Sequence, residues 1–311
     1  MKNRKMAIAA VAFAGTLFFG GKMVTTHAAD TTTAITATKA PTQNQFTPSN
    51  ALLHKSAKYY RTNYTKLRSQ YRVYKSYQSG IAKNGQIKIY INPKGVTKDM
   101  KTSLRLAVSY WNQKLGTNVI KLNAKKGHSA EFKVASKSTD AEEDAYWDQD
   151  SRTLALDLKP YNKSLSSLSQ QLTENYSDKL DKELEAKVKT YSDSLGSTTP
   201  DTTAKVQAYR DSLTAQNKAK LSEAEQNIKK DKLDYASRNL YYGAVLAHEL
   251  GHALGLGHSP LADDTMNATS DSPEVHDYED VLKAPKSGYN PLTKTDVSRA
   301  KLALQIFKAF H

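Results

Sequence analysis

The spacing of histidine and glycine over residues 248–258, which read HELGHALGLGH, constrains this chain more than any other feature. His248 and His252 are four residues apart, so on a helix both imidazoles project from one face, one turn apart, and can share a cation. Glu249 follows the first histidine, at an angle that lets its carboxylate reach a water on that cation without taking a ligand position. The segment is therefore expected to be a helix that presents two metal ligands and one carboxylate.

Two further residues complete the pattern. Gly255 can adopt the left-handed conformation that ends a helix, so the chain can turn back after it. His258 can then approach the same cation from the other side. Three neutral imidazoles that leave one position open are typical of a catalytic zinc site, whereas structural zinc sites are closed by four protein ligands. The sequence thus predicts one zinc ion held by His248, His252 and His258.

These eleven residues resemble the metzincin signature HExxHxxGxxH. Ser259, directly after the third histidine, and Met266, eight residues beyond it, are most similar to the matrixin branch. Position 268 is Ala, where astacin-like and serralysin-like enzymes carry a Tyr that can reach the zinc. The resemblance implies that Met266 is the Met-turn residue, an apolar floor beneath the imidazoles rather than a ligand. The similarity is loose over residues 86–160 and close over 240–306.

The resemblance also implies an activity. A matrixin-like protein of this kind is expected to be a bacterial secreted zinc metalloendopeptidase, with Glu249 as the general base toward the attacking water. Tyr289 and Pro291 follow the Met-turn where matrixins wall their specificity pocket, so they are expected to bind substrate; an ordinary buried Tyr and a turn Pro are the alternative. An extended substrate would pair with an edge strand, for which residues 145–147 are the candidate.

The sequence departs from the animal matrixins in two respects. It has no Cys, which excludes their Cys-based latency. His128 is the only His in residues 81–247, so a second, structural zinc is not expected. Calcium is left open, because the acidic residues within 148–150 and 263–264 have no recognisable ligand spacing.

Hydrophobic periodicity predicts an α/β (α+β) fold with a mixed sheet and an inserted helical hairpin. The resemblance implies that this fold is metzincin-like, with a mixed twisted sheet, two long helices and a C-terminal helix. A strand is expected at 86–91 and a helix over 97–115, opened by Thr97 as its cap. Thr293 and Asp296 form a capping box at the start of the C-terminal helix. The other expected strands are 119–122, 130–135 and 153–158.

Residues 162–235 break the alternation of strands and helices. Leu, Tyr and Val recur there every three or four residues on both sides of the turn-like residues 196–200. This pattern predicts two antiparallel helices, each about 45 Å long, inserted between the last strand and the metal-binding helix. The hairpin is expected to be a lid or a docking surface for a substrate or partner protein, or else a spacer with no role in turnover.

The N-terminal residues have the marks of an export signal. Basic residues, a short apolar run and small residues before Ala29 predict a signal peptide over 1–28, with an uncleaved anchor as the alternative. Residues 29–80 are low in complexity and then basic and Tyr-rich, and could be a wall-binding stalk, a pro-segment or a helix packed on the domain. The catalytic domain is then expected in two parts, 81–161 and 236–311, on either side of the hairpin.

Charge and the lack of Cys bear on location. The formal net charge is +14, and loss of the four basic residues within 1–28 leaves +10. Export without Cys suits a Gram-positive cell surface or medium, where folding does not rely on disulfides, so the protein is expected to be secreted or wall-associated. The positive charge would attract anionic wall polymers. The alternative is that the charged side chains only keep the surface solvated. Neither nucleic-acid binding nor a transmembrane domain after signal cleavage is expected.

Two other functions fit parts of the pattern. The chain could be a non-proteolytic wall-binding or host-binding protein on a zinc-protease scaffold, although the intact Glu249 argues against a pure binder. It could also hydrolyse the peptides of peptidoglycan, which a comparison of purified wall with casein as substrates would separate.

Overall fold

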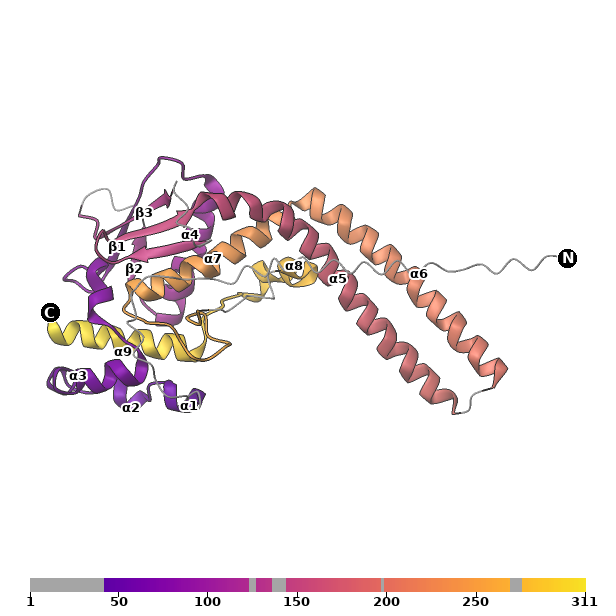
Figure 1. The fold of residues 1–311 in the computed structure, drawn as a ribbon, viewed down its shortest axis with the longest axis horizontal. Coiled ribbons are helices and arrows are strands. Elements are labelled where there is room, and N and C mark those ends of the chain that lie inside the picture. Colours follow the sequence, from indigo (N-terminus) through magenta and orange to yellow (C-terminus); the bar gives the residue numbers. More distant parts are fainter. Residues whose placement is uncertain (1–41, 123–126, 136–143, 197–198, 269–275) are drawn as a thin grey trace.

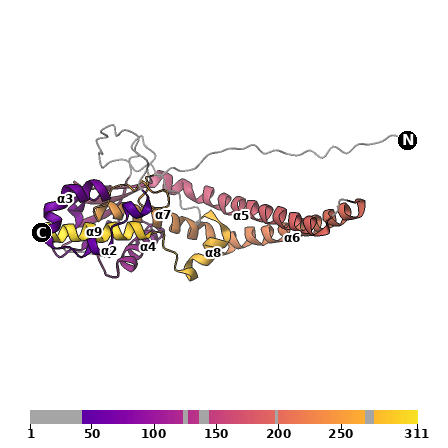
Figure 2. The ribbon, with the colours of Figure 1, turned by 90° about the horizontal axis from the view of Figure 1, so that it is seen from below.

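The computed structural model describes residues 42–122, 127–135, 144–196, 199–268 and 276–311. The expected signal peptide, at 1–28, lies outside the described residues. The described part is elongated, with a compact sheet-and-helix body at one end and a long helical hairpin at the other (Figures 1 and 2). Within the described residues no helix is both long and apolar enough to span a bilayer.

A five-stranded mixed sheet forms one layer of the body. Its strands are β1 (Ile87–Ile91), β2 (Ile120–Leu122), β3 (Ala130–Ala135), β4 (Ala145–Asp148) and β5 (Thr153–Asp157). Their order is β2-β1-β3-β5-β4, and all the pairs are parallel except β4 with β5. The four strands expected from alternation are all present, within one residue at either end. The candidate edge segment lies in β4, which is an antiparallel edge strand.

Two helices, α4 (Lys98–Leu115) and α7 (Leu233–Ala253), pack together beside the sheet and form most of the core with it. Thr97 caps α4, because its side chain accepts a hydrogen bond from the backbone N–H of Met100. The indole of Trp111 lies fully buried and donates from Nε1 to the carbonyl of Ala247, at 2.7 Å. This bond ties α4 to the part of α7 that carries the predicted ligands.

The N-terminal segment packs on this body. It contains α1 (Gln43–Phe46), α2 (Asn50–Leu53), α3 (Ala57–Tyr71) and the short 3-10 helix η1 (Lys75–Gly80). Helix α3 lies along the C-terminal helix α9 (Lys294–Phe310), and Tyr60, Leu67 and Tyr71 belong to the same hydrophobic core as α7. This packing agrees with one of the three alternatives, a helix packed on the domain, and does not test the wall-binding stalk or the pro-segment.

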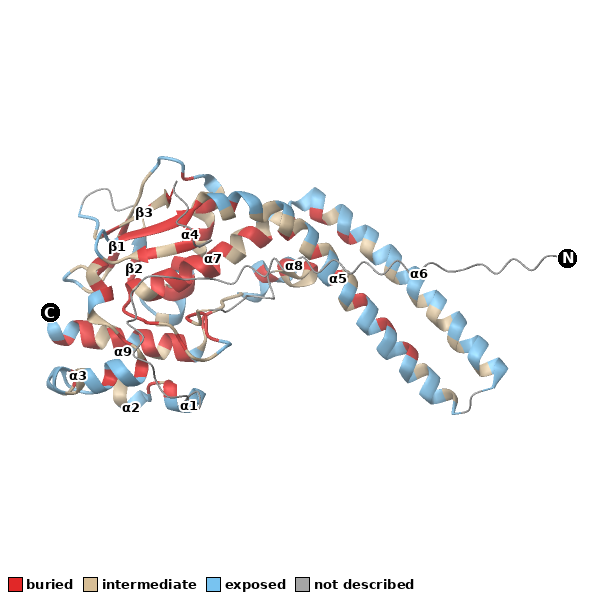
Figure 3. Ribbon diagram, viewed as in Figure 1, coloured by how far each residue is buried: buried red, intermediate tan, exposed pale blue. Residues whose placement is uncertain are grey.

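The hairpin consists of α5 (Leu158–Leu195) and α6 (Pro200–Asp231). Helix α5 follows β5 without a loop, and Lys232, with φ 52°, is the only residue between α6 and α7. The first arm therefore starts at 158, before the expected 162, and α7 starts at 233, before the expected 236. Figure 3 shows that exposed residues dominate the outer part of both arms, whereas α7 is buried along most of its length.

The base of the hairpin holds another helix, α8 (Tyr278–Ser287), in a second hydrophobic cluster. Lys179 of α5 pairs with Glu279 at 2.9 Å. Asn227 of α6 donates to the hydroxyl of Tyr278, also at 2.9 Å. The hairpin is thus anchored to the segment that leads from the Met-turn to α9. With its mixed sheet, long helices, C-terminal helix and inserted hairpin, the molecule confirms the predicted fold class.

Candidate functional site

Helix α7 and the loop after it bring the three predicted histidines together. The Nε2 atoms of His248 and His252 are 3.1 Å apart, as expected for neighbours one helical turn apart. One ring nitrogen from each of these residues and one from His258 lie within 4.8 Å of one another. Two nitrogens bound to one tetrahedral zinc at 2.0–2.1 Å are about 3.3 Å apart, so this spacing suits that ion.

The backbone orients two of the rings. Nδ1 of His248 contacts the carbonyl oxygen of Thr265 and Nδ1 of His252 contacts that of Leu256, both at 2.7 Å. A carbonyl only accepts, so each Nδ1 carries the proton and each Nε2 presents a lone pair. Burial lowers the pKa of His248 to about 3 and the pKa of His252 well below its ordinary value, which keeps both rings neutral. Neutral, oriented imidazoles are the donors that zinc requires, so the residues fit this metal.

The loop that carries His258 turns at Gly255, as the sequence predicted. Gly255 has φ +102°, a conformation that favours glycine, and a Cβ there would lie 2.8 Å from the side chain of Gln78. A Cβ at Gly257 would lie 2.4 Å from the ring of Tyr74. Both glycines thus allow the N-terminal segment to approach the loop closely.

Residues 72–74 form a strap behind the metal-ligand loop. Val73 pairs with Leu256 in an antiparallel bridge, with Tyr74 N donating to the carbonyl of Gly255 at 2.7 Å. Leu256 is also the residue whose carbonyl orients His252. Arg72 donates from Nη1 to the carbonyl of His258, at 3.1 Å. The strap therefore supports two of the three predicted ligands, although it lies outside the predicted catalytic domain.

Arg299 of α9 locks the strap to the loop. Its guanidinium is fully buried and donates to the carbonyl of Tyr71 at 2.9 Å and to that of Gly257 at 2.7 Å, and it lies over the ring of Phe46. Burial lowers the pKa of Arg299 to about 10, which still leaves it charged at neutral pH. Sequence reasoning missed this residue, although its spacing of three from Asp296 and four from Ala303 places it on the buried face of α9.

We expect Arg299→Ala to destabilise the zinc-loaded protein by about 3–5 kcal/mol, because two carbonyls and the buried carboxylate of Asp296 would lose their cationic neighbour. Urea unfolding measures the difference. Arg61→Ala is the control: Arg61 also donates to a backbone carbonyl, that of Ala309, but from an exposed position, and should cost about 1 kcal/mol or less. Equal losses in the two variants would contradict the assigned role of Arg299.

The Met-turn packs directly beneath the ligand helix. Met266 is fully buried, and a Cβ at Gly251 would lie 2.2 Å from its sulfur and 3.2 Å from the ring of Trp111. Close packing against Met266 and Trp111 therefore explains the glycine at position 251. The carboxylate of Asp296 accepts from the backbone N–H groups of Thr265, at 3.0 Å, and Met266, at 3.3 Å. The capping box at the start of α9 thus also fixes the Met-turn.

The acidic residues near the turn have structural partners. Asp264 is buried and accepts from the hydroxyls of Ser259 and Thr293, at 2.5 and 2.6 Å. Asp148 accepts from the backbone of the turn that follows β4. Among the described residues, the histidine trio is the only group of three or more His, Asp or Glu side chains arranged to hold a metal. Calcium binding gains no support.

Glu249 lies beside the trio and against the edge strand. Its side chain is 2% exposed, and Oε2 accepts a hydrogen bond from the backbone N–H of Trp147 at 2.8 Å. Because this N–H donates to Glu249, it points away from the neighbouring strand β5, whose Leu154 lies opposite Trp147 in the antiparallel register. The edge of β4 and the predicted catalytic carboxylate therefore line the same side of the site.

Tyr289 and Pro291 lie close to the Met-turn. The ring of Tyr289 packs edge-on to that of Tyr110 in α4, with centroids 6.0 Å apart, and the carbonyl of Pro291 accepts from the hydroxyl of Thr265 at 2.8 Å. Each residue thus has a structural partner, and their part in substrate binding stays a prediction.

The fold and the site together define a zinc metalloprotease of the metzincin type. A model of the matrixin family matches residues 84–283, about two thirds of the chain. The protein therefore belongs to the matrixins, which are zinc-dependent metalloproteases, and the predicted resemblance is confirmed. No curated protein and no solved structure matches the chain. The strap and helix α9 lie outside the residues that the family model covers.

Proposed function

We propose that the protein is a secreted zinc endopeptidase in which His248, His252 and His258 hold the metal and Glu249 is the general base. The observation that carries this proposal is the convergence of three ring nitrogens within 4.8 Å beside a buried carboxylate. A non-proteolytic binding protein would have no use for that carboxylate, so the binding-only alternative is the weaker one.

Zinc, when bound, supplies a Lewis acid that polarises the scissile carbonyl and makes the attacking water acidic enough to give up a proton at neutral pH. Glu249 accepts the proton of the attacking water and delivers it to the leaving amine. The carbonyls of Thr265 and Leu256 keep two of the imidazoles in the tautomer that can bind metal. The buried side chain of Met266 packs against Gly251 and so fixes the position of α7 relative to the Met-turn.

The substrate is proposed to lie extended along β4. An edge strand presents unpaired backbone N–H and C=O groups, which can pair with a peptide and place its scissile bond beside Glu249. The outward N–H of Trp147 is the group of that edge that reaches the carboxylate. Backbone pairing would supply most of the binding free energy, and side-chain pockets the selectivity.

The proposal is tested by incubating the purified protein with a proteome-derived peptide library, with and without a chelator, and sequencing the new termini. We expect internal cleavage that the chelator abolishes and zinc restores. Cleavage confined to peptidoglycan peptides would favour the wall-hydrolase alternative, and no cleavage of either substrate class would contradict an enzymatic role.

The hairpin is proposed to dock protein substrates or a partner. Its outer arms are exposed and its base is fixed to α8, so the arms can be shortened without disturbing the site. We expect replacement of residues 186–209 by a short Gly/Ser loop to leave kcat/KM for short peptides within about twofold, while casein cleavage falls several-fold. Steady-state kinetics on both substrates measure this. Unchanged casein cleavage would make the outer hairpin a spacer.

A further inference from the structure

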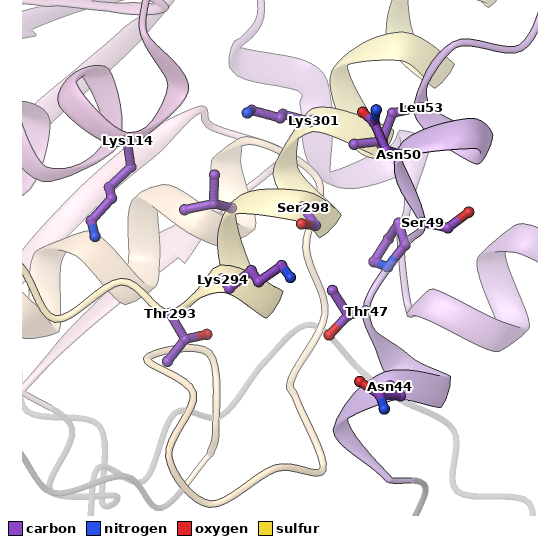
Figure 4. A pocket seen from close by; sticks show the side chains of 12 residues that line it. Asn44, Thr47, Ser49, Asn50, Leu53, Lys114, Thr293, Lys294, Ser298 and Lys301 are labelled. Atoms are coloured by element: carbon purple, nitrogen blue, oxygen red, sulfur yellow. The ribbon is translucent and has the colours of Figure 1, made fainter.

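A polar groove lies between the N-terminal segment and helix α9, and no histidine lines it. Its volume is 630 Å³. Figure 4 shows Lys294, Ser298 and Lys301 of α9 between Lys114, near the end of α4, and the segment that contains α1 and α2. The groove is thus built by elements that lie largely outside the region covered by the family model.

The only charged side chains that line the groove are positive. Its residues are Asn44, Thr47, Pro48, Ser49, Asn50, Leu53, Lys114, Thr293, Lys294, Val297, Ser298 and Lys301. Three are lysines, none is acidic, and six others carry a hydroxyl or an amide. Ammonium, hydroxyl and amide groups donate hydrogen bonds to phosphate oxygens, and hydroxyl and amide groups also pair with the hydroxyls of sugars and polyols.

Most of the net positive charge of the chain lies in residues 42–122, which supply seven of the twelve residues that line the groove, including Lys114. Residues 42–122 contain fifteen Lys and Arg and one acidic residue, Asp99, whereas residues 123–311 contain 25 Lys and Arg and 29 Asp and Glu. The positive charge that the sequence predicts for the exported protein therefore lies in the N-terminal part and is not dispersed. A concave site whose only charged lining residues are lysines attracts anions more strongly than a flat surface does.

The three lysines of the groove form no ion pair with an acidic side chain in the described part of the chain. The ion pairs found there lie within the hairpin, within α8 or between the two, apart from one between Arg238 and Asp99. None involves Lys114, Lys294 or Lys301. An anionic ligand in the groove would therefore not have to displace an internal carboxylate.

The lining also indicates which polyanion fits. Proteins that bind single-stranded nucleic acid stack its bases on aromatic side chains, and no aromatic residue lines the groove. Leu53, Pro48 and Val297 are its only apolar side chains, too few to insert into a lipid surface. Alternating phosphate and hydroxyl groups match the lysines and the hydroxyl and amide side chains. We propose that this groove binds a phosphodiester-linked polyol polymer and so holds the protease at a phosphate-rich surface.

The test measures binding of synthetic poly(glycerol phosphate) by fluorescence polarisation at low and high salt. We expect the variant K114A/K294A/K301A to lose at least about tenfold in affinity, and wild-type binding to weaken as salt rises. The matched control, K218A/K220A/K229A, removes the same charge from exposed positions on α6 and should change affinity less than about threefold. Cleavage of a short peptide should be the same in all three proteins, which also shows that the variants are folded.

Three outcomes would overturn the proposal: no binding by the wild type, equal losses in the two triple variants, or equal affinity for an oligo(dT) of matched charge. The last would indicate a non-selective attraction to polyanions. A tenfold loss confined to the groove variant, together with weaker binding of oligo(dT), would support the assigned site. None of these outcomes depends on the proteolytic activity.

Discussion

Glu249→Gln should leave zinc bound and reduce kcat for peptide hydrolysis by about 10³-fold, because the proposed general base is lost while the ligands stay intact. Glutamine keeps an oxygen that can accept the hydrogen bond from the backbone N–H of Trp147, so the edge strand should remain in place. Zinc content and steady-state kinetics, measured on the same preparation, give the result.

The matched control is Glu225→Gln, which removes one negative charge from an exposed position on α6 and should leave both zinc content and kcat unchanged. Turnover by the Glu249 variant within about tenfold of the wild type would show that this carboxylate is not the base. Loss of zinc in the same variant would instead give Glu249 a part in holding the metal, contrary to the proposed roles.

His252→Ala should abolish zinc binding and activity together. Loss of a group that merely orients a metal ligand weakens zinc binding by 10–100-fold in general, so loss of the ligand itself should exceed about 100-fold. We expect zinc to fall from about one ion per chain to a residual amount after dialysis, as measured by mass spectrometry of the metal. His128→Ala is the control, since His128 is exposed and packs against Tyr90 far along the sheet. A His252 variant that retains full zinc would contradict the ligand set.

Much of the fold is predictable because local patterns determine it. Thr97 and the Thr293–Asp296 capping box start their helices where the sequence places them, since their side chains bond to backbone groups within the same turn. The strands agree within a residue because short apolar runs mark them: β3 begins by alternating buried and half-buried residues, whereas β5 is buried at every position. The metal-binding pattern lies in one short segment, so the helical period alone brings His248 and His252 together.

The errors at the hairpin have a local cause. No Gly or Pro marks the boundary between α6 and α7; Lys232 makes the kink with a positive φ that lysine seldom adopts. Buried apolar residues lie on both sides of it, at Ile228 and Leu233, so the pattern of apolar residues does not mark the kink. Apolar residues on both sides of a kink give no sign of where one helix ends, so the sequence predicts a start for α7 that is three residues too late.

The support behind the site could not be predicted, because it depends on contacts between distant parts of the chain. The strap pairs Val73 with Leu256, and the partners of Arg299 lie more than 200 residues away at Tyr71 and 42 residues away at Gly257. Such pairs leave no periodic trace in one sequence. The glycines at 255 and 257 were the accessible signal, but the sequence does not show what they accommodate.

The most direct test of the central claim is anomalous X-ray scattering from crystals of the zinc-loaded protein, recorded at the zinc absorption edge. We expect one strong peak, about 2.0–2.1 Å from a ring nitrogen of each of His248, His252 and His258 and beside the carboxylate of Glu249. A zinc ion bound elsewhere, or a zinc ion at this site whose fourth coordination position is filled by a protein side chain, would contradict the account.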